Sequence, residues 1–292
     1  MKNRIKKIVC PIDFSDVANN AMEFAAQLSH QLNASLTLWN MRELPIVDEI
    51  TTQSKLPNAI DKRQKELSNI LQDWCEEIKT EYDIPCGYSI GSGVNTMEET
   101  LAHYIDGENF DLIVVGTNGV DDIYQFFFGT NSYRIMNSVE CPVMVVPEGY
   151  KFKEISSVLF ATNYSSGDAK LAQDLMNTFN INISFVHISK KAGLISNEVY
   201  RAFKNIFEEK FEGEHQTVKF KRLIEKDKLD GLIELMIEEE AELVILSTKH
   251  RNWLEEFFHK SFTKQVLGGI QIPALILHQE KNMENFSLSL EE

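Results

Sequence analysis

The sequence has few of the features that mark several common protein classes. Its four cysteines in 292 residues form no CxxC pair and lie far in sequence from histidine, which excludes a disulfide scaffold and argues against a zinc site. No apolar run approaches the ~20 residues that a membrane-spanning helix requires. The basic first seven residues lead directly into a short apolar run, without the hydrophobic region of a signal peptide. We therefore expect a cytoplasmic protein without a membrane partner.

Positive charge is also scarce. The chain has 29 Lys and Arg against 44 Asp and Glu, a net charge of −15. Residues 1–150 carry 11 basic and 22 acidic side chains, whereas residues 151–292 carry 18 and 22. Such a chain is repelled by nucleic acid and by anionic lipid, so neither is an expected partner. An anionic ligand of the first half would have to be held by something other than lysines.

The composition is that of a globular protein, with 43% hydrophobic and 25% charged residues, and the length favours two domains. The two halves also resemble each other. Residues 8–15 (IVCPIDFS) correspond to 158–165 (VLFATNYS), displaced by 150 positions. A second displacement of 131 positions carries DLIVV at 111–115 onto ELVIL at 242–246, and CPVMVV at 141–146 onto IPALIL at 272–277.

Several features that share one displacement indicate a tandem duplication. The Phe pair at 126–127 recurs at 257–258 with the same displacement of 131, which argues for a structural role in both halves. The change from 150 to 131 means that the second copy is about 19 residues shorter. We expect the shortening to lie between its second strand and its second helix.

Each half alternates apolar strand patterns with helical patterns. Strands are predicted at 7–11, 35–39, 86–90, 112–115 and 143–146, and at 157–161, 183–187, 217–223, 243–246 and 274–277. Helices of the first half are predicted near 16–32, 61–81, 96–109 and 130–137. Short apolar runs without clean alternation suit strands buried on both faces of a parallel sheet. The fold class is therefore α/β, with two tandem doubly wound, Rossmann-like five-stranded domains at 1–148 and 154–280 and an acidic tail at 281–292.

Ligands of such folds bind outside the carboxyl ends of the strands, where two segments of the first half stand out. Asp13 follows the first strand, where it could contact a ligand or form an Asx-turn, with Ser15 or Asp16 as the helix cap. The loop after the fourth strand carries Gly116 and Gly119, which could serve a ligand or only a tight turn. Gly129 and Thr130 open a helix whose free N–H groups can receive phosphate oxygens.

These segments together resemble the ATP-binding branch of the universal stress protein family. That branch is marked by Gly, two residues, Gly, nine residues, Gly, then Ser or Thr, and the spacing is kept here by Gly116, Gly119, Gly129 and Thr130. The DLIVVG strand, Asp13 and the CPVMVV strand fit the family as well. The resemblance covers the chain as two consecutive family domains.

The resemblance implies a nucleotide site in the first half. By position, Asp13 matches the acid that contacts adenosine, Pro11 and Ile12 the backbone around the base, and Gly116 and Gly119 the loop along ribose and phosphate. Gly129, Thr130 and Asn131 match the phosphate cradle, although the family usually has Val where this chain has Asn131. The loop 116–132 has no Lys or Arg, so we expect Mg²⁺ or Mn²⁺ to accompany ATP.

The second half departs from the pattern. Its corresponding positions carry Ser247, His250 and Lys260 in place of the three glycines, and Asn163 in place of Asp13. We expect this copy to be degenerate. The basic residues near 249–251 could attract another anion, but a solvated charged loop is the more common role of such a run.

The preferred hypothesis is a tandem universal stress protein that binds ATP or a related adenine nucleotide in its first domain and has a stress-response or regulatory role. One alternative is a slow ATP hydrolase, for which the sequence offers no evident base or arginine finger. The other is a protein-interaction module that binds no nucleotide. The strands at 143–146 and 274–277 are predicted to pair within the chain as a pseudo-dimer, with a homodimer also possible.

Overall fold

The computed structural model describes residues 5–41, 56–91, 95–117, 130–178, 180–189, 196–211, 216–225, 228–248 and 272–278. The first half contains β1 (Lys7–Pro11), α1 (Asp16–Leu32), β2 (Ser35–Met41), α2 (Leu56–Tyr82), β3 (Cys86–Gly91), α3 (Met97–Glu108), β4 (Leu112–Thr117), α5 (Thr130–Ser138) and β5 (Val143–Pro147). The second half contains β6 (Ser157–Ala161), α6 (Ser166–Thr178), β7 (Asn182–Ser189), α7 (Asn197–Phe211), β8 (Val218–Ile224), α8 (Lys228–Glu238), β9 (Leu243–Thr248) and β10 (Ala274–His278).

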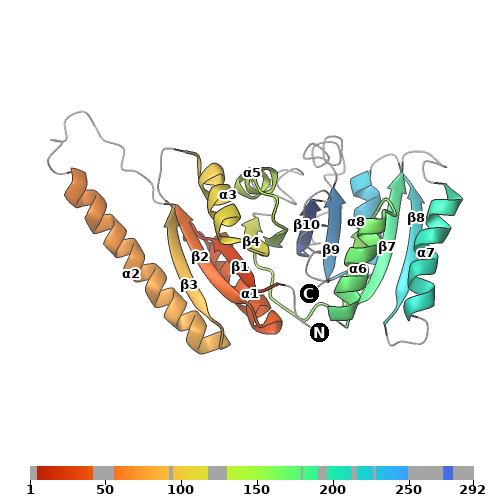
Figure 1. Cartoon of the computed structure of the whole chain (residues 1–292), viewed down its shortest axis with the longest axis horizontal. Coiled ribbons are helices and arrows are strands. Elements are labelled where there is room, and N and C mark those ends of the chain that lie inside the picture. Colours follow the sequence, from red (N-terminus) through yellow and green to blue (C-terminus); the bar gives the residue numbers. More distant parts are fainter. Residues whose placement is uncertain are drawn as a thin grey trace.

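The described strands form a ten-stranded sheet in the order β3-β2-β1-β4-β5-β10-β9-β6-β7-β8, with β3 and β8 at its two ends (Figure 1). The five strands of each half are parallel to one another. This is the doubly wound α/β architecture that the sequence predicts, present twice. The halves meet where β5 pairs antiparallel with β10. At this seam the strands of the two halves therefore run in opposite directions, so their carboxyl ends point opposite ways.

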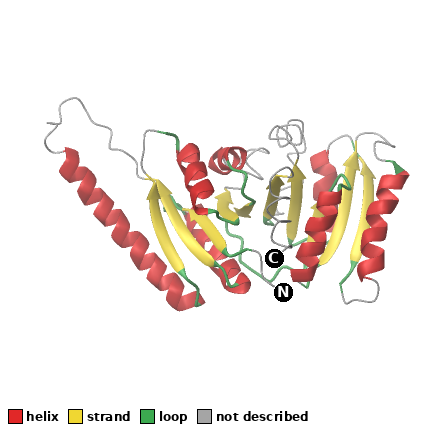
Figure 2. Ribbon diagram, viewed as in Figure 1, coloured by secondary structure: helices red, strands yellow, loops and turns green. Residues whose placement is uncertain are grey.

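Helices cover both faces of the sheet, which explains why its central strands are apolar on both sides (Figure 2). Alternate residues of β1 show the two layers, because Ile8 belongs to the buried cluster that contains residues of α1 and α2, whereas Val9 belongs to the one that contains residues of α3 and α5. Both side chains are fully buried. The site-bearing strand is therefore held rigidly from both faces.

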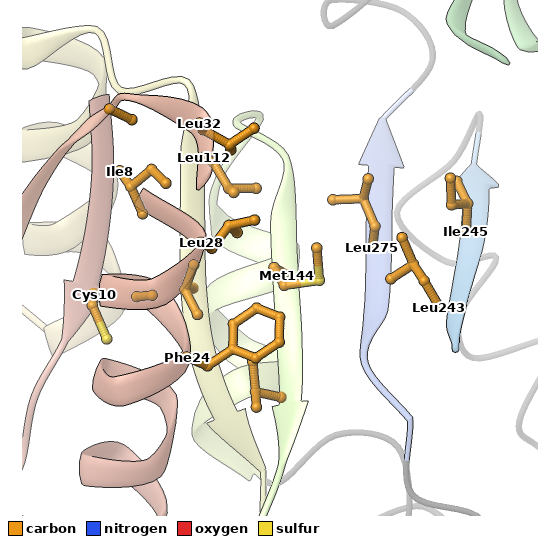
Figure 3. Packing of buried hydrophobic residues seen from close by; sticks show 14 of the residues in the cluster. Ile8, Cys10, Phe24, Leu28, Leu32, Leu112, Met144, Leu243, Ile245 and Leu275 are labelled. Carbon is orange, nitrogen blue, oxygen red and sulfur yellow. The ribbon is translucent and has the colours of Figure 1, made fainter. Parts of the chain in front are cut away.

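The seam between the halves is itself part of the core. Val143, Met144 and Val145 of β5 pair with Ile276, Leu275 and Ala274 of β10. Figure 3 shows Met144 and Leu275 facing each other across the seam. All six side chains are buried, so separation of the halves would expose apolar surface on both strands.

An acidic residue fixes the first strand of each half in the same way. Asp111, just before β4, accepts the backbone N–H groups of Lys6 and Lys7 through Oδ2 at 2.7 and 2.9 Å. Glu242, just before β9, accepts those of Ser156 and Ser157 through Oε2 at 2.7 and 3.2 Å. Asp111 and Glu242 correspond at the displacement of 131 positions.

The helix boundaries follow from local capping. The Ser15 side chain accepts the N–H of Ala18 at the start of α1, and Thr96 forms a capping box with Glu99 at the start of α3. Asn33 and Asn109 end these helices in the left-handed conformation. The predicted helices at 16–32 and 96–109 are thus confirmed to within a residue at each end.

The shortening of the second half differs in part from the prediction. It was expected in the connection between the second strand and the second helix, but α7 has 15 residues where α2 has 27. Most of the loss is therefore within the helix. A helix over an edge strand can be shortened by whole turns without disturbing the sheet beneath it.

The segment between the halves is packed against the first half. Tyr150 and Phe152 contact the Phe24 ring of α1, with centroids 6.0 and 5.2 Å away. Burial, and then the Glu242 carboxylate, raise the pKa of Tyr150 to about 12. The connection is therefore a packed part of the fold that approaches both halves.

Candidate functional site

The predicted site residues converge on a topological switch point of the first half. Strand β1 lies between β2 and β4. The chain leaves β1 through α1 on one face of the sheet and reaches β4 through α3 on the other face. A reversal of this kind leaves a crevice outside the carboxyl ends of the two central strands. Pro11 and Asp13 follow from β1, and Gly116 lies at the end of β4.

The pairing of β1 with β4 stops early. Ile8 pairs with Leu112 and Val9 with Ile113, whereas β1 pairs with β2 over its full length. The carboxyl-terminal parts of β1 and β4 are therefore not joined, although β4 continues to pair with β5 as far as Thr117. The backbone pairing of the two strands therefore ends before their carboxyl ends.

Pro11 supplies a physical reason for the early end of the β1–β4 pairing. Backbone N–H groups alternate in direction along a strand, and the N–H of Ile12 donates to the Trp39 carbonyl oxygen of β2 at 2.7 Å. An N–H at position 11 would therefore point toward β4, and proline has none. The predicted site residue Pro11 thus removes a donor on the β4 side of β1.

The second half keeps the same two strands joined. Its β6 pairs with β9 at four positions, from Val158–Leu243 to Ala161–Leu246. At the displacement of 150 positions Ala161 replaces Pro11, so its N–H is present. The pairing that ends early in the first half is therefore longer at the corresponding place in the second.

The main chain after β1 is held in place by the end of β2. Asn40 is buried, and its Nδ2 donates to the Ile12 carbonyl oxygen at 2.6 Å. With the bond from the Ile12 N–H, both polar backbone groups of Ile12 are fixed. Asn40 was not predicted to be a site residue, although a lone Asn near the end of an apolar strand was a signal that could have identified it.

Asp13 combines the two roles that the sequence left open. Its Oδ1 accepts the N–H and the hydroxyl of Ser15 at 3.0 and 2.6 Å, which forms an Asx-turn. Ser15 is the helix cap, as expected for an Asp13 that does not cap α1. Asp13 is exposed, and Oδ1 is the oxygen that accepts both bonds. The next residue, Phe14, takes a left-handed φ of 65° and packs on Trp74 at 5.2 Å.

Gly116 is required by close packing. A Cβ at this position would lie 2.5 Å from the Val17 carbonyl oxygen and 2.6 Å from Val17 Cγ1. The glycine therefore lets the first turn of α1 approach the end of β4. In the second half the corresponding pair is Ser247 and Gly167, so the small residue has moved from the strand to the helix. Val17 was not identified from the sequence.

Thr130 begins α5, as predicted, with Asn131 as its next residue. The N-terminal N–H groups of this nine-residue helix have no partners within the helix, as in any helix. Gly119 and Gly129 lie outside the described residues, as do Asp121, Asp122 and the Phe run at 126–128. The side chains of Thr130 and Asn131 are also outside what the structure describes.

A family model described as the universal stress protein family matches residues 4–147. The first half of the chain is a universal stress protein domain. A universal stress protein of Methanocaldococcus jannaschii is 26% identical over 157 residues, which are 51% of this chain and 86% of that protein. A Staphylococcus aureus relative named for the same family is 28% identical over 146 residues, which are 48% and 83%. A solved universal stress protein from Archaeoglobus fulgidus shares the fold over 94% of this chain and 96% of that one, with a TM-score of 0.65 and 12% identity.

Within this universal stress protein, the second half rebuilds the same frame with different side chains. His187 takes the place of Asn40, because its Nδ1 bonds the Thr162 carbonyl oxygen at 2.9 Å. The Thr162 hydroxyl donates to buried Asp168 at 2.7 Å, and Ser165 caps α6 as Ser15 caps α1. The buried His187 imidazole therefore has a structural role through its Nδ1.

In the described part of this universal stress protein, no group of three or more His, Cys, Asp or Glu side chains could hold a metal ion by itself. Among the same residues, none of the helices is both long and apolar enough to cross a membrane.

Proposed function

We propose that this universal stress protein binds ATP or a related adenine nucleotide in its first half and has a stress-response or regulatory role. The early end of the β1–β4 pairing, at Val9 and Ile113, carries the proposal. It lies at the switch point of the half that keeps the glycine spacing, whereas in the half without the glycines β6 and β9 pair over four positions.

The proposed contacts run from the base to the phosphates. The main chain of Pro11 and Ile12 lies beside the base, with Ile12 fixed by bonds from and to β2. The exposed Asp13 accepts a hydroxyl of the nucleoside. Gly116 and Gly119 follow the ribose and phosphates. Gly129, Thr130 and Asn131 present backbone N–H groups at the start of α5, where the helix dipole favours negative charge.

Mg²⁺ or Mn²⁺ would accompany a triphosphate. Since the described residues hold no ready cluster of metal ligands, the phosphate oxygens would supply much of the coordination, as Mg²⁺ prefers at nucleotide sites. The cation would neutralise phosphate charge beside an acidic half. A weak hydrolase activity has no additional support in the described residues.

We propose further that the two halves form an intrachain pseudo-dimer through β5 and β10, with domains at 1–148 and 154–280 and the tail 281–292 outside the described residues. The buried antiparallel seam supports this. A homodimer would then need another surface. We also propose a cytoplasmic location, because the four cysteines are free thiols, as is usual in that reducing compartment.

The first experiment is to denature the purified full chain and chromatograph any nucleotide released, then to titrate the nucleotide-free protein with Mg-ATP by calorimetry. We expect either a co-purified adenine nucleotide or saturable binding with about one site per chain. A ligand at 100 times its Kd would also stabilise the fold by about 2.7 kcal/mol. Absence of released nucleotide, of binding and of stabilisation would refute the proposal and favour an interaction module.

A matched pair of variants locates the site. Pro11→Ala restores an N–H toward β4, so we expect weaker nucleotide binding with the fold retained. Ala161→Pro makes the reciprocal change in the second half and is expected to leave nucleotide affinity unchanged. Equal losses in both variants, or a loss in Ala161→Pro alone, would place the nucleotide elsewhere.

A further inference from the structure

We propose that two copies of this chain form a homodimer in which their β3 strands pair antiparallel and join the two ten-stranded sheets. Among the described strands, β3 lies at the end of the sheet and pairs with β2 alone (Figure 1). Strand β5 already pairs with β10 of its own chain, so a second copy needs another edge. The proposal therefore rests on the intrachain seam and does not depend on nucleotide binding.

The register of β3 on β2 shows which backbone groups of β3 face outward. Leu36 pairs with Cys86, and the Leu36 N–H donates to the Pro85 carbonyl oxygen at 2.9 Å. In a parallel ladder the polar groups of successive residues point alternately toward the neighbouring strand and away from it. Because Pro85 faces β2, both polar backbone groups of Cys86, Tyr88 and Ile90 point out of the sheet edge.

These outward groups are arranged symmetrically about Tyr88. An antiparallel copy centred there pairs Tyr88 with Tyr88 of the second copy, and Cys86 with Ile90 on either side. Each of these pairs is of the hydrogen-bonded type, in which the two residues exchange both of their N–H···O=C bonds. The contact is isologous, as a two-fold dimer requires. A second β3 strand therefore supplies a partner for every backbone group that this edge exposes.

The side chains at this edge also suit a second copy. Residues 84–95 contain no charged side chain, although the chain has a net charge of −15. Tyr88 is 36% exposed, and its hydroxyl donates to Ser68 Oγ of α2 at 3.4 Å. On the other face of β3, Gly87 is exposed, and a Cβ there would have nothing within 4 Å. Two acidic chains can therefore meet here without like charges on the paired strands, and their Tyr88 rings would form a cross-strand aromatic pair.

The strand at the other end of the described sheet is protected against such pairing. β8 carries Lys219, Lys221 and Arg222 among its seven residues. Lys221 pairs with Glu238 at 2.8 Å, which holds the lysine along this edge. Two copies of β8 paired over their full length would place Lys221 directly opposite Lys221, and like charges in that position destabilise a sheet. Lysine is a common protection of edge strands, and β3 has none.

The first test is sedimentation velocity of the full chain over a range of concentrations, for which we expect a concentration-dependent dimer. Tyr88→Lys puts like charges beside the two-fold axis and should weaken dimerisation by about tenfold or more. Tyr88→Thr keeps an uncharged, strand-forming residue and should weaken it less. Ile224→Lys adds the same charge on β8, at a residue that is 60% exposed, and should associate as the wild type does.

A cross-link tests the register directly. The Cα atoms of a hydrogen-bonded antiparallel pair lie about 5.5 Å apart, a distance that a disulfide spans. Tyr88→Cys should therefore give a disulfide-linked dimer on mild oxidation, and dithiothreitol should release it. The wild type, whose four cysteines are buried, should give no such dimer. Ile224→Cys is the matched control on β8 and should also stay unlinked.

A chain that is monomeric at every concentration would overturn the proposal, and so would a dimer that Tyr88→Lys leaves unchanged. Cross-linking of Ile224→Cys without cross-linking of Tyr88→Cys would place the contact at β8 instead. If Tyr88→Lys leaves the dimer intact and Ile276→Asp dissociates it, the copies meet at β5 and β10. None of these measurements requires a nucleotide, so a chain that dimerises through β3 without binding ATP would contradict the proposed function alone.

Discussion

The two halves of this universal stress protein share a frame but differ at the end of their central strands. Asp111 and Glu242 fix the first strands alike, and Ser15 and Ser165 cap the first helices alike. In the first half the pairing of β1 with β4 ends after two positions, and in the second half β6 and β9 pair over four. The two halves therefore share a frame, and a single proline accompanies the difference in pairing at the switch point.

The largest effect is expected at the seam that joins the halves. Ile276 is fully buried opposite Val143. Ile276→Asp would bury a carboxylate, and we expect a loss of about 4 kcal/mol or more in the free energy of unfolding. Ile276→Val should cost only about 1 kcal/mol. Urea unfolding followed by fluorescence measures both.

The same experiment tests whether the halves depend on each other. We expect one transition for the wild type and two for Ile276→Asp, because the halves then unfold separately. Two well-separated transitions in the wild type would show that the seam contributes little to cooperativity.

The next largest effect concerns the strand-fixing acids. Burial opposes ionisation of Glu242, but the Ser156 N–H, Lys153, the Ser156 hydroxyl and the Ser157 N–H together lower its pKa from 4.5 to about 2. A pKa lowered by folding stabilises the protein above the ordinary pKa, and this contribution disappears as the pH falls toward 2. We expect Glu242→Gln to cost about 2–3 kcal/mol near neutral pH.

The pH dependence is the decisive readout for Glu242. The difference in unfolding free energy between wild type and Glu242→Gln should shrink between about pH 5 and pH 2. The exposed Glu234→Gln serves as control and should show little change at any pH. Asp111→Asn should cost less, about 1 kcal/mol, because the Glu242 carboxylate, besides its backbone bonds, also pairs with the Lys153 ammonium at 3.0 Å. A difference that is constant with pH would contradict the assigned role of Glu242.

The exchange of the small residue between strand and helix gives a third effect. Gly116→Ser places a Cβ against the Val17 carbonyl oxygen, and overpacking of this kind costs about 1–3 kcal/mol. Adding Val17→Gly copies the second half, which has Gly167 and Ser247, and should recover part of the loss. Gly107→Ser, at a position with nothing within 4 Å of a Cβ, should show no comparable loss. Thermal unfolding of the wild type and the three variants measures these differences. If the double variant is no more stable than Gly116→Ser, the proposed exchange of the small residue is wrong.

The smallest effect is expected at the bond that fixes Ile12. Asn40→Ala leaves the Ile12 carbonyl oxygen without its side-chain donor and should cost about 1 kcal/mol. Asn40→His copies His187 and should cost less than Asn40→Ala. If both variants lose the same stability, the two halves do not use these side chains interchangeably.

Much of the fold could be predicted from sequence because burial and capping leave local signals. The apolar runs of β1 and β5 and the Ser15 cap were recognised at nearly their observed bounds. The partners of Gly116 and Asn40 could not be predicted, because each contact is with a distant segment. Val17 and Ile12 carry no local mark of that contact. The positions of Gly119 and Gly129 remain predictions.

The sequence alone determined the duplication, the order of strands and helices, and the glycine spacing that favours a nucleotide in the first half. These depend on which residues recur and at what distance along the chain. Only the tertiary structure decided that the β1–β4 pairing ends after two positions while β6 and β9 pair over four. This depends on which backbone groups meet across the sheet, where Pro11 leaves no N–H to pair.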